Sequence, residues 1–233
     1  MNLIDKIESL ITMHQEGPYW DFKREWYGDN KDGDMLIDII CMANNLVDKD
    51  AYIIIGVDEE NDYSIQNVMQ DTNRRNTQML TDFIRGKKFA GDFRPIVTVE
   101  QVQLNEGAVD VIVVHNSTNT PYFLKEKYKG VFANNIYVRL QDSNTPSDKS
   151  ADFHHIEYLW KKRFGMLLSP IEKVMLYLKH PEHWEIVHQA KIRNTISMLR
   201  NLRLIILMNR RMVGMVMSTI CLLRPIQDHI GAT

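Results

Sequence analysis

Cysteine is scarce in this sequence, and so are the motifs that mark the common nucleotide and zinc enzymes. Its two cysteines, Cys41 and Cys221, lie far apart in apolar surroundings and form no C-x-x-C pair. This usage favours a reducing compartment over a disulfide framework or a cysteine zinc site. The sequence also contains no GxxxxGK[ST], GxGxxG, GxSxG or HExxH pattern, so it lacks the usual markers of P-loop, dinucleotide-binding, serine-hydrolase and zinc-protease chemistry.

Long hydrophobic runs are missing as well. The longest apolar stretch, near the C-terminus, is interrupted by Asn209, Arg210 and Arg211, which leaves it too short for a membrane-spanning helix. The first fifteen residues combine acidic side chains with helical apolar spacing, which is not the pattern of a signal peptide. We therefore expect a cytoplasmic protein with no membrane partner.

The chain has no large excess of charge of either sign, but its small net charge hides an asymmetry. The formal charge of the 233 residues is −2. Residues 189–233 contain seven Lys or Arg and one acid, a balance of +6, so residues 1–188 carry −8. Because the overall charge does not attract nucleic acid, any basic binding surface must be local.

Apolar periodicity, which is abundant, predicts a mixed α+β architecture. Spacing of 3.6 residues predicts helices, and alternation or short apolar runs predict strands. The expected helices are 2–14, 34–47, 72–85, 149–164 and 170–179, and the expected strands are 19–26, 52–57, 96–104, 108–115, 121–125 and 135–140. We expect a mixed, mostly antiparallel sheet of five or six strands, with the helices packed on it.

The composition changes near residue 188, beyond which the chain is rich in Met, Leu, Ile and Arg. We expect two domains, 1–165 and 166–233, of which the second forms a helical, basic appendage. Three interpretations remain open for residues 189–233: a basic arm for nucleic acid, a dimerisation element, or a tail that is not a native functional segment, such as one read through a frameshift.

An acidic cluster near the N-terminus is the first candidate for chemistry. Glu16, Asp21 and Lys23 lie within EGPYWDFKREW, and the apolar strand YIIIGVDEE ends in Asp58 and Glu59. Converging carboxylates bind divalent cations, which orient and activate water against a phosphodiester. Alternatively, Lys23 simply neutralises Asp21, since both lie on one face of a strand, while Trp20 and Phe22 lie on the other.

Polar residues at strand and helix ends form a second candidate site. Asparagines and arginines at such positions suit phosphate and sugar contacts, but they also cap helices and close loops. The residues expected to bind nucleic acid are Lys23, Arg24, Asn44, Arg74, Arg75 and Arg139.

The order of these motifs resembles the Schlafen AlbA-type (AlbA_2, formerly divergent AAA) domain family over roughly residues 3–165. The motifs are, in order, Glu16-x4-Asp21-x-Lys23, Ala43-Asn44-Asn45, Ile55-Gly56-Val57-Asp58, Asn73-Arg74, Ile136-Tyr137-Val138-Arg139 and Asn144-Thr145-Pro146. The chain looks like a bacterial-type, single-domain member of this family.

This resemblance implies a Schlafen AlbA-like fold and a nucleic-acid-binding protein, with RNA or DNA as its partner. Some animal relatives are RNases with a three-carboxylate site, which matches Glu16, Asp21 and either Asp58 or Glu59 here. In that case these acids hold Mg²⁺ or Mn²⁺, and Lys23 contacts phosphate. The animal nucleases pair two lobes in one chain, so the resemblance also implies a homodimer.

Three functions follow as hypotheses. The first is nucleic-acid binding with divalent-metal-dependent endoribonuclease activity on structured RNA, carried by Glu16, Asp21, Lys23 and Asp58. The second is a non-catalytic DNA-binding regulator of transcription or defence. The third is an ATP-binding module, because IIIGVDEE resembles a Walker B strand although no P-loop accompanies it.

Overall fold

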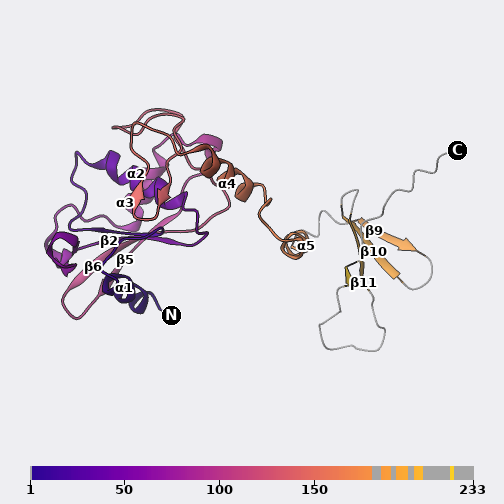
Figure 1. Cartoon of the computed structure of the whole chain (residues 1–233), viewed down its shortest axis with the longest axis horizontal. Helices are drawn as coiled ribbons and strands as arrows, with labels where there is room; N and C mark the ends of the chain where they lie inside the picture. The colour runs from indigo at the N-terminus through magenta and orange to yellow at the C-terminus, as the bar shows by residue number, and fades with distance from the viewer. Residues whose placement is uncertain (1, 180–184, 190–192, 199–201, 207–220, 223–233) are drawn as a thin grey trace. The chain divides into compact units, whose positions relative to one another are not determined.

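The structure, a computed structural model, describes residues 2–179, 185–189, 193–198, 202–206 and 221–222 (Figure 1). The chain divides into two compact units, Met1–Leu167 and Leu168–Thr233. Side chains are described only up to residue 179, so the expected basic side chains of residues 189–233 lie outside the described part. The assignment of a separate domain to residues 166–233 stays a prediction.

A mixed four-stranded sheet forms the centre of the first unit. Its strands are β1 (Trp20–Lys23), β2 (Ala51–Ile55), β5 (Val97–Gln103) and β6 (Ala108–Val114), in the order β1-β2-β6-β5. β1 and β2 are parallel, whereas the β2–β6 and β6–β5 pairs are antiparallel. The expected α+β class is confirmed, with four strands in the main sheet instead of five or six.

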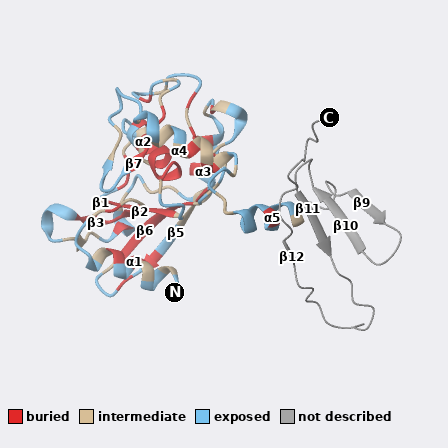
Figure 2. Ribbon diagram, turned by 45° about the vertical axis from the view of Figure 1, so that its right-hand side comes forward, coloured by how far each residue is buried: buried red, intermediate tan, exposed pale blue. Residues whose placement is uncertain are grey.

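Helices cover both faces of this sheet (Figure 1). One face packs on α2 (Asp32–Ala43) and α3 (Thr77–Arg85), and the other on α1 (Leu3–Thr12). The alternation along β2 places Ile53 and Ile55 in the first cluster and Tyr52 and Ile54 in the second, as the period of two in a strand requires. Buried residues accordingly concentrate in the sheet and in α2 (Figure 2).

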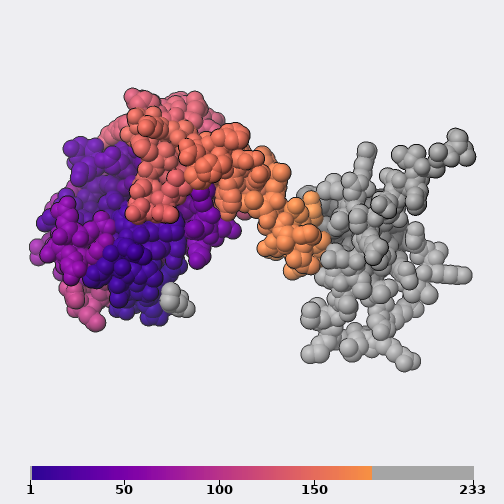
Figure 3. Space-filling model, in the orientation of Figure 1, coloured from indigo at the N-terminus to yellow at the C-terminus, as the bar shows by residue number. Residues whose placement is uncertain are grey.

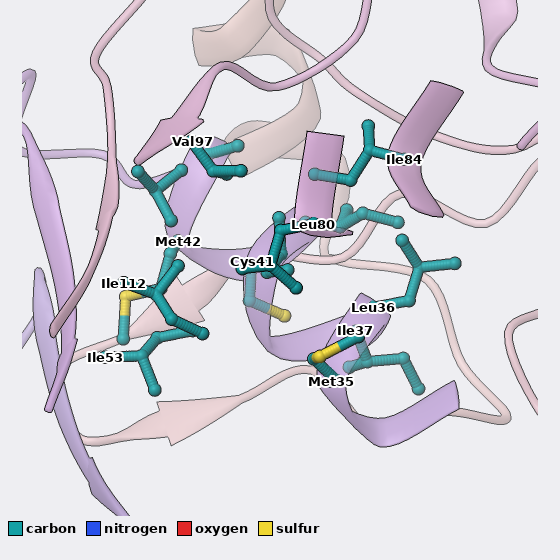
Figure 4. Close-up of a cluster of buried hydrophobic side chains, with 14 of the residues drawn as sticks. Met35, Leu36, Ile37, Cys41, Met42, Ile53, Leu80, Ile84, Val97 and Ile112 are labelled. Carbon is teal, nitrogen blue, oxygen red and sulfur yellow. The ribbon is translucent and has the colours of Figure 1, made fainter. Parts of the chain in front are cut away.

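The larger core lies between α2 and the sheet. Nine of the twelve residues of α2 are buried, because neighbouring segments cover the helix on most of its circumference. In Figure 4, Met42 of α2 lies beside Ile112 and Ile53 of the sheet. A helix with this burial is held by tertiary packing more than by its own propensity.

Helix ends follow the local capping chemistry. The Asn2 side chain caps α1 by accepting a hydrogen bond from the Asp5 amide, and Asn76 caps α3 by accepting one from the Met79 amide. α3 therefore begins at Thr77, five residues after the predicted start. The remaining helix of this unit is α4 (Phe153–Arg163).

Two expected strands, 121–125 and 135–140, do not join the main sheet. Only an isolated bridge from Phe89 to Leu124 and the short pair β7 (Arg139–Leu140) and β8 (Ser143–Asn144) are formed. The Asn44 side chain takes the place of a neighbouring strand. It accepts from the Tyr122 amide (2.8 Å) and donates to the carbonyls of Tyr122 (2.9 Å) and Tyr137 (2.8 Å).

Gly56 turns the chain away from the main sheet after β2. Its φ of +100° is strained for any other residue, and a Cβ there would lie 2.7 Å from Val68 Cγ1. The next residues form β3 (Val57–Asp58), which pairs with β4 (Ser64–Ile65) in a separate two-stranded ribbon. Asp58 therefore does not continue the edge of the sheet that carries β1.

Short 3₁₀ turns complete the first unit: η1 (Glu59–Asn61), η2 (Val68–Gln70) and η3 (Ala90–Asp92). In the second unit, α5 (Pro170–Leu178) starts with a capping box between Ser169 and Glu172.

A helical appendage is expected for residues 166–233, but the described residues beyond α5 are strands in the order β12-β11-β10-β9. They are β9 (Glu185–Gln189), β10 (Arg193–Met198), β11 (Leu202–Ile206) and β12 (Cys221–Leu222). Their content of Ile, Val and Thr favours strands over helices. Over the described ranges, no helix is both long and apolar enough to cross a membrane.

Asn44→Ala should destabilise the protein by about 3–5 kcal/mol, because it leaves three backbone groups of Tyr122 and Tyr137 buried without partners. Urea denaturation measures the loss. Asn135→Ala is the control, since it removes one exposed hydrogen bond of 3.2 Å, and it should cost less than about 0.5 kcal/mol. Equal effects of the two changes would refute the strand-replacing role of Asn44.

Candidate functional site

The polar face of β1 brings together the N-terminal candidate residues. Trp20 and Phe22 pack in the core cluster under α1, so Asp21 and Lys23 lie on the opposite face, as the alternation predicts. The two side chains form a close ion pair. Glu16, in the turn before β1, accepts a hydrogen bond from the Phe22 amide (2.9 Å), which fixes this carboxyl beside Asp21.

A buried arginine holds these two acids. The guanidinium of Arg139, 1% exposed, bonds Glu16 Oε2 at 2.6 Å and Asp21 Oδ1 at 3.0 Å. It also donates to the Gly17 carbonyl (2.7 Å) and to Asn144 Oδ1 (3.2 Å). A planar guanidinium can satisfy several acceptors at once, which makes arginine suited to this position.

A third carboxylate of the site comes from α2. Asp38 Oδ2 lies 3.9 Å from Lys23 Nζ. Asp38 also accepts hydrogen bonds from the Tyr27 hydroxyl (2.6 Å) and from Asn144 Nδ2 (2.7 Å). We call the following set the Arg139 network: Glu16, Asp21, Lys23, Asp38, Arg139 and Asn144.

The acids of the Arg139 network differ in protonation. Burial, together with the neighbouring Asp21 carboxylate, raises the pKa of Glu16 to about 8. Burial also raises the pKa of Asp21, but the charges of Lys23 and Arg139 and a hydrogen bond from Glu16 outweigh it and hold this pKa below its usual range. Burial raises the pKa of Asp38 to about 6. Near neutral pH, Glu16 is therefore protonated and donates to Asp21.

The net charge of the network is close to zero. Asp21 and Asp38 carry negative charge, Lys23 and Arg139 carry positive charge, and Glu16 is neutral. This balance limits the desolvation cost of burying so many polar groups. Asp21 and Lys23 are therefore arranged as an ion pair, which is the alternative interpretation of the acidic cluster.

Asp58, expected as the third metal ligand, lies outside this network. It pairs with Arg24, whose Nε is 3.5 Å from Asp58 Oδ2, because the turn at Gly56 takes it into the β3–β4 ribbon. Glu59, the other expected candidate, is exposed at the start of η1. Among the described residues, Glu16 and Asp21 form no group with a third acid in which all ligand atoms lie within 4.8 Å of one another.

The arginines and the asparagine expected to bind nucleic acid mostly have intramolecular roles. Arg74 makes two hydrogen bonds to Asp110 (2.7 and 2.8 Å), and Arg75 pairs with Asp32 at 2.8 Å. Asn44 and Arg139 are buried, so neither is accessible to a ligand in this fold. Arg24, with 67% of its side chain exposed, and Lys23, with 31%, are the accessible members of the group near β1.

Sequence reasoning missed Asp38, although its position carried a signal. Asp38 is an acid within the otherwise apolar run Met35–Ala43 of α2. A buried acid in such a run needs a partner, because an unpaired buried charge is costly. The partner, Lys23, comes from another element, and nothing local identifies it.

A second surface, away from the expected site, is basic and aromatic. The chain runs antiparallel to itself here, with the Lys125 amide bonded to the Lys88 carbonyl at 2.7 Å. Lys87 Nζ lies 4.1 Å from the ring centroid of Phe83 and 3.7 Å from that of Tyr128. We call the following set the lysine–aromatic surface: Phe83, Lys87, Lys88, Lys125, Lys127, Tyr128, Lys129 and Phe132.

Comparisons with known proteins place most of this unit in a family. The family model "Schlafen, AlbA_2" matches residues 16–148, more than half of the chain. Among solved structures, the crystal structure of the DIP2311 protein from Corynebacterium diphtheriae is similar, with 20% identity and a TM-score of 0.37. The match covers 62% of this chain and 29% of the DIP2311 chain, so this chain spans under a third of that protein's length. No curated protein matches the sequence.

Glu16→Gln should make stability less dependent on pH. Folded Glu16 keeps its proton up to about pH 8, whereas the unfolded chain loses it near 4.5. The folded state therefore binds more protons in this window, and the wild-type protein loses stability as pH rises through it. Glutamine cannot ionise, so the variant should avoid this loss, on the order of 1–3 kcal/mol.

Denaturant unfolding at both ends of that pH window measures the effect. The pKa of Asp21 is lowered and lies below this window. The pKa of Asp38, about 6, lies inside it, but Asp38 is present in both proteins, so the comparison isolates Glu16. Glu8→Gln, at an exposed position of α1, is the control. A stability difference between wild type and Glu16→Gln that stays constant with pH would contradict the assignment of a protonated Glu16.

Proposed function

Since this chain belongs to the Schlafen AlbA_2 family, we propose that it binds nucleic acid, and that the lysine–aromatic surface makes the contact. The observation that carries the proposal is a local concentration of positive charge. Residues 85–94 and 123–132 lie side by side and contain seven Lys or Arg and two acids, in a chain whose net charge is −2. A phosphate backbone is the partner that such a surface attracts.

Two lysines of this surface, Lys88 and Lys125, can exchange their present partners for phosphates at little cost. Lys88 lies 3.7 Å from Glu126, and Lys125 lies 3.8 Å from Asp92, with more than half of every one of these four side chains exposed. Exposed ion pairs of this kind contribute about 0–1 kcal/mol. Phosphate oxygens would replace the carboxylates and release counterions, which favours binding at low salt.

The aromatic rings of this surface suit contacts with bases. Phe132 is 40% exposed, and Lys127 Nζ lies 4.3 Å from its ring centroid. Tyr128 and Phe83 lie edge to face, 6.0 Å apart, below Lys87. A base can stack on such a ring while the neighbouring lysine holds the phosphate, and this combination accepts either RNA or DNA.

The Arg139 network supports this function by positioning β1, α2 and the 139–144 turn. Its members neutralise one another, and Lys23 is the accessible cation among them. In this scheme Lys23 and Arg24 extend the nucleic-acid contact beyond the lysine–aromatic surface. The homodimer implied by the family resemblance, and ATP binding as a weaker alternative, stay predictions.

Lys125→Ala/Lys127→Ala should weaken nucleic-acid binding and reduce its salt dependence. If each lysine contacts one phosphate, the slope of log K against log salt should become shallower by about 1.4 for a single strand or 1.8 for a duplex. Fluorescence anisotropy over a series of salt concentrations measures the slope.

The matched control is Lys6→Ala/Lys49→Ala, which removes two lysines that also lie over an aromatic ring. Their Nζ atoms are 5.8 and 5.2 Å from the ring centroid of Tyr19, which is not part of the lysine–aromatic surface. This control should keep the wild-type slope. The proposed surface is wrong if the control lowers the slope and Lys125→Ala/Lys127→Ala does not.

A divalent-metal-dependent endoribonuclease acting on structured RNA is the second candidate function. What favours it is the pair of carboxyl groups of Glu16 and Asp21, which hydrogen-bond each other at the end of a strand beside Lys23. We propose Glu16 and Asp21 as ligands of Mg²⁺ or Mn²⁺. Asp38 is the third acid in place of Asp58, and it would have to move closer to the other two to reach the same ion. Lys23 would then pair with a phosphate of the RNA.

If this activity exists, Mn²⁺-dependent cleavage of total tRNA should rise with pH through about 8, because metal binding requires Glu16 to lose its proton. Glu16→Gln and Asp21→Asn should each reduce cleavage to the level seen with a chelator. These near-isosteric changes preserve side-chain volume next to the buried Arg139.

Asp58→Asn is the control in the cleavage assay, and it should retain activity because Asp58 pairs with Arg24 outside the network. Loss of activity in Asp58→Asn alone would move the catalytic site to β3. Activity that survives both Glu16→Gln and Asp21→Asn would remove the Arg139 network from catalysis.

A further inference from the structure

The start of α4 brings together three side chains that suit a metal ion. Asp152, His154 and His155 each offer a ligand atom, and these atoms lie within 4.8 Å of one another. Within the described ranges, this is the one group of three or more acidic, histidine or cysteine side chains that meets this condition. None of the three belongs to the Arg139 network or to the lysine–aromatic surface.

The helix start explains why the three side chains meet. Asp152 is the N-cap of α4, with an extended backbone (φ −62°, ψ 148°), and its carbonyl accepts from the amides of His155 (3.0 Å) and Ile156 (3.2 Å). An Asp at this position normally caps the helix with its side chain as well. Here the side chain makes no capping hydrogen bond, so its carboxylate is available to another partner.

His155 has an unsatisfied ring nitrogen. Its Nδ1 is buried and has no hydrogen-bond partner, although buried polar atoms almost always have one. The two imidazoles lie close together, with ring centroids 3.7 Å apart and planes inclined at 47°.

The electrostatics of His155 also fit a ligand. Burial and the neighbouring His154 lower the pKa of His155, and Asp152 opposes this only in part. A metal binds the neutral form of histidine, so a lowered pKa keeps His155 available near neutral pH.

We propose that Asp152, His154 and His155 form a binding site for a divalent transition-metal ion such as Zn²⁺. Two imidazoles and one carboxylate are a ligand set that suits zinc and neighbouring metals better than Mg²⁺ or Ca²⁺, which prefer oxygen ligands. Three protein ligands leave at least one coordination position for water or for an anionic group.

The geometry requires a small closure around the ion. Ligand atoms about 2.0–2.2 Å from a tetrahedral zinc lie roughly 3.4 Å from one another. The ligand atoms of these three side chains lie up to 4.8 Å apart, so they must move closer together to bind the ion. Asp152 and His154 are exposed and can close by changing rotamer, while His155 is half-buried and supplies the fixed ligand. The segment that contains α4 lies at the molecular surface, which leaves a path for the ion (Figure 3).

The helix N-terminus itself opposes a cation, because its dipole is positive. The Asp152 carboxylate lies at this end and offsets the dipole. The proposal therefore depends on the two imidazoles and the carboxylate together, and it predicts that each of the three is needed. It also stands independently of nucleic-acid binding, because none of these residues is used in that proposal.

The test is a Zn²⁺ titration of the full chain without an affinity tag, in competition with a chromogenic chelator. Four other histidines, at positions 180, 183, 188 and 229, lie outside the residues with described side chains, so the comparison is between variants and wild type. His155→Ala, His154→Ala and Asp152→Asn should each weaken the tightest site at least about 100-fold, since even outer-shell partners of metal ligands account for about 10–100-fold.

His115→Ala is the matched control, because His115 also lies near a carboxylate, 3.8 Å from Asp50, but has no second histidine beside it. It should bind Zn²⁺ like wild type. Co²⁺ in place of Zn²⁺ should give visible absorption bands that disappear in the three site variants and persist in the control. A denaturant unfolding curve measured without metal shows whether each variant is folded. If His155→Ala does not fold, the test of the site rests on His154→Ala, which changes an exposed position.

The proposal is overturned if His154→Ala and Asp152→Asn bind Zn²⁺ with the stoichiometry and affinity of wild type. It is equally overturned if His115→Ala loses as much affinity as they do, since binding would then not depend on the start of α4. Loss of the tightest site in the three variants alone would establish the ligand set.

Discussion

A single buried guanidinium connects the two parts of the domain that define its candidate site. Arg139 bonds Glu16, Asp21 and the Gly17 carbonyl at one end of the chain, and Asn144 in its own turn. These contacts join residues more than 100 positions apart, so they form only in the folded state. An arginine buried this deeply is stable only with all of its partners in place. The position of β1 against the 139–144 turn therefore depends on this one side chain.

The chemistry of the acids follows from the same constraint. Arg139 and Lys23 supply two positive charges, and Asp21 and Asp38 supply the matching negative charges. Burial and the neighbouring Asp21 carboxylate then hold Glu16 in its neutral form with a raised pKa, although Arg139 opposes this shift. This arrangement accounts for an acidic cluster that does not repel itself. It also separates two roles within the domain. The network holds elements together, whereas the exposed positive charge available to a phosphate backbone lies mainly on the lysine–aromatic surface.

Polar side chains replace regular secondary structure at several places in this fold. Asn44 takes hydrogen bonds that a neighbouring strand would otherwise make for Tyr122 and Tyr137. The Asp110 carboxylate accepts hydrogen bonds from Arg74 Nε and from the Trp26 indole nitrogen, each at 2.7 Å. Residues with polar side chains at the ends of elements therefore act here as structural connectors. The start of α4 differs, because Asp152 and His155 have polar atoms that such connections leave unused.

Local pattern was enough to predict most elements of the first unit and its α+β class, because periodicity reports which face of a helix or strand is buried. It also placed Asp21 and Lys23 on one face of β1. Pattern could not place Asp58, since the turn at Gly56 sends it into a separate ribbon, nor could it select Asp38 from α2 as a second acid beside Lys23. It did not show that Lys87 lies over Phe83 and Tyr128, or that 121–125 stays out of the sheet. These outcomes depend on contacts between residues distant in sequence, and such contacts exist only once the chain has packed.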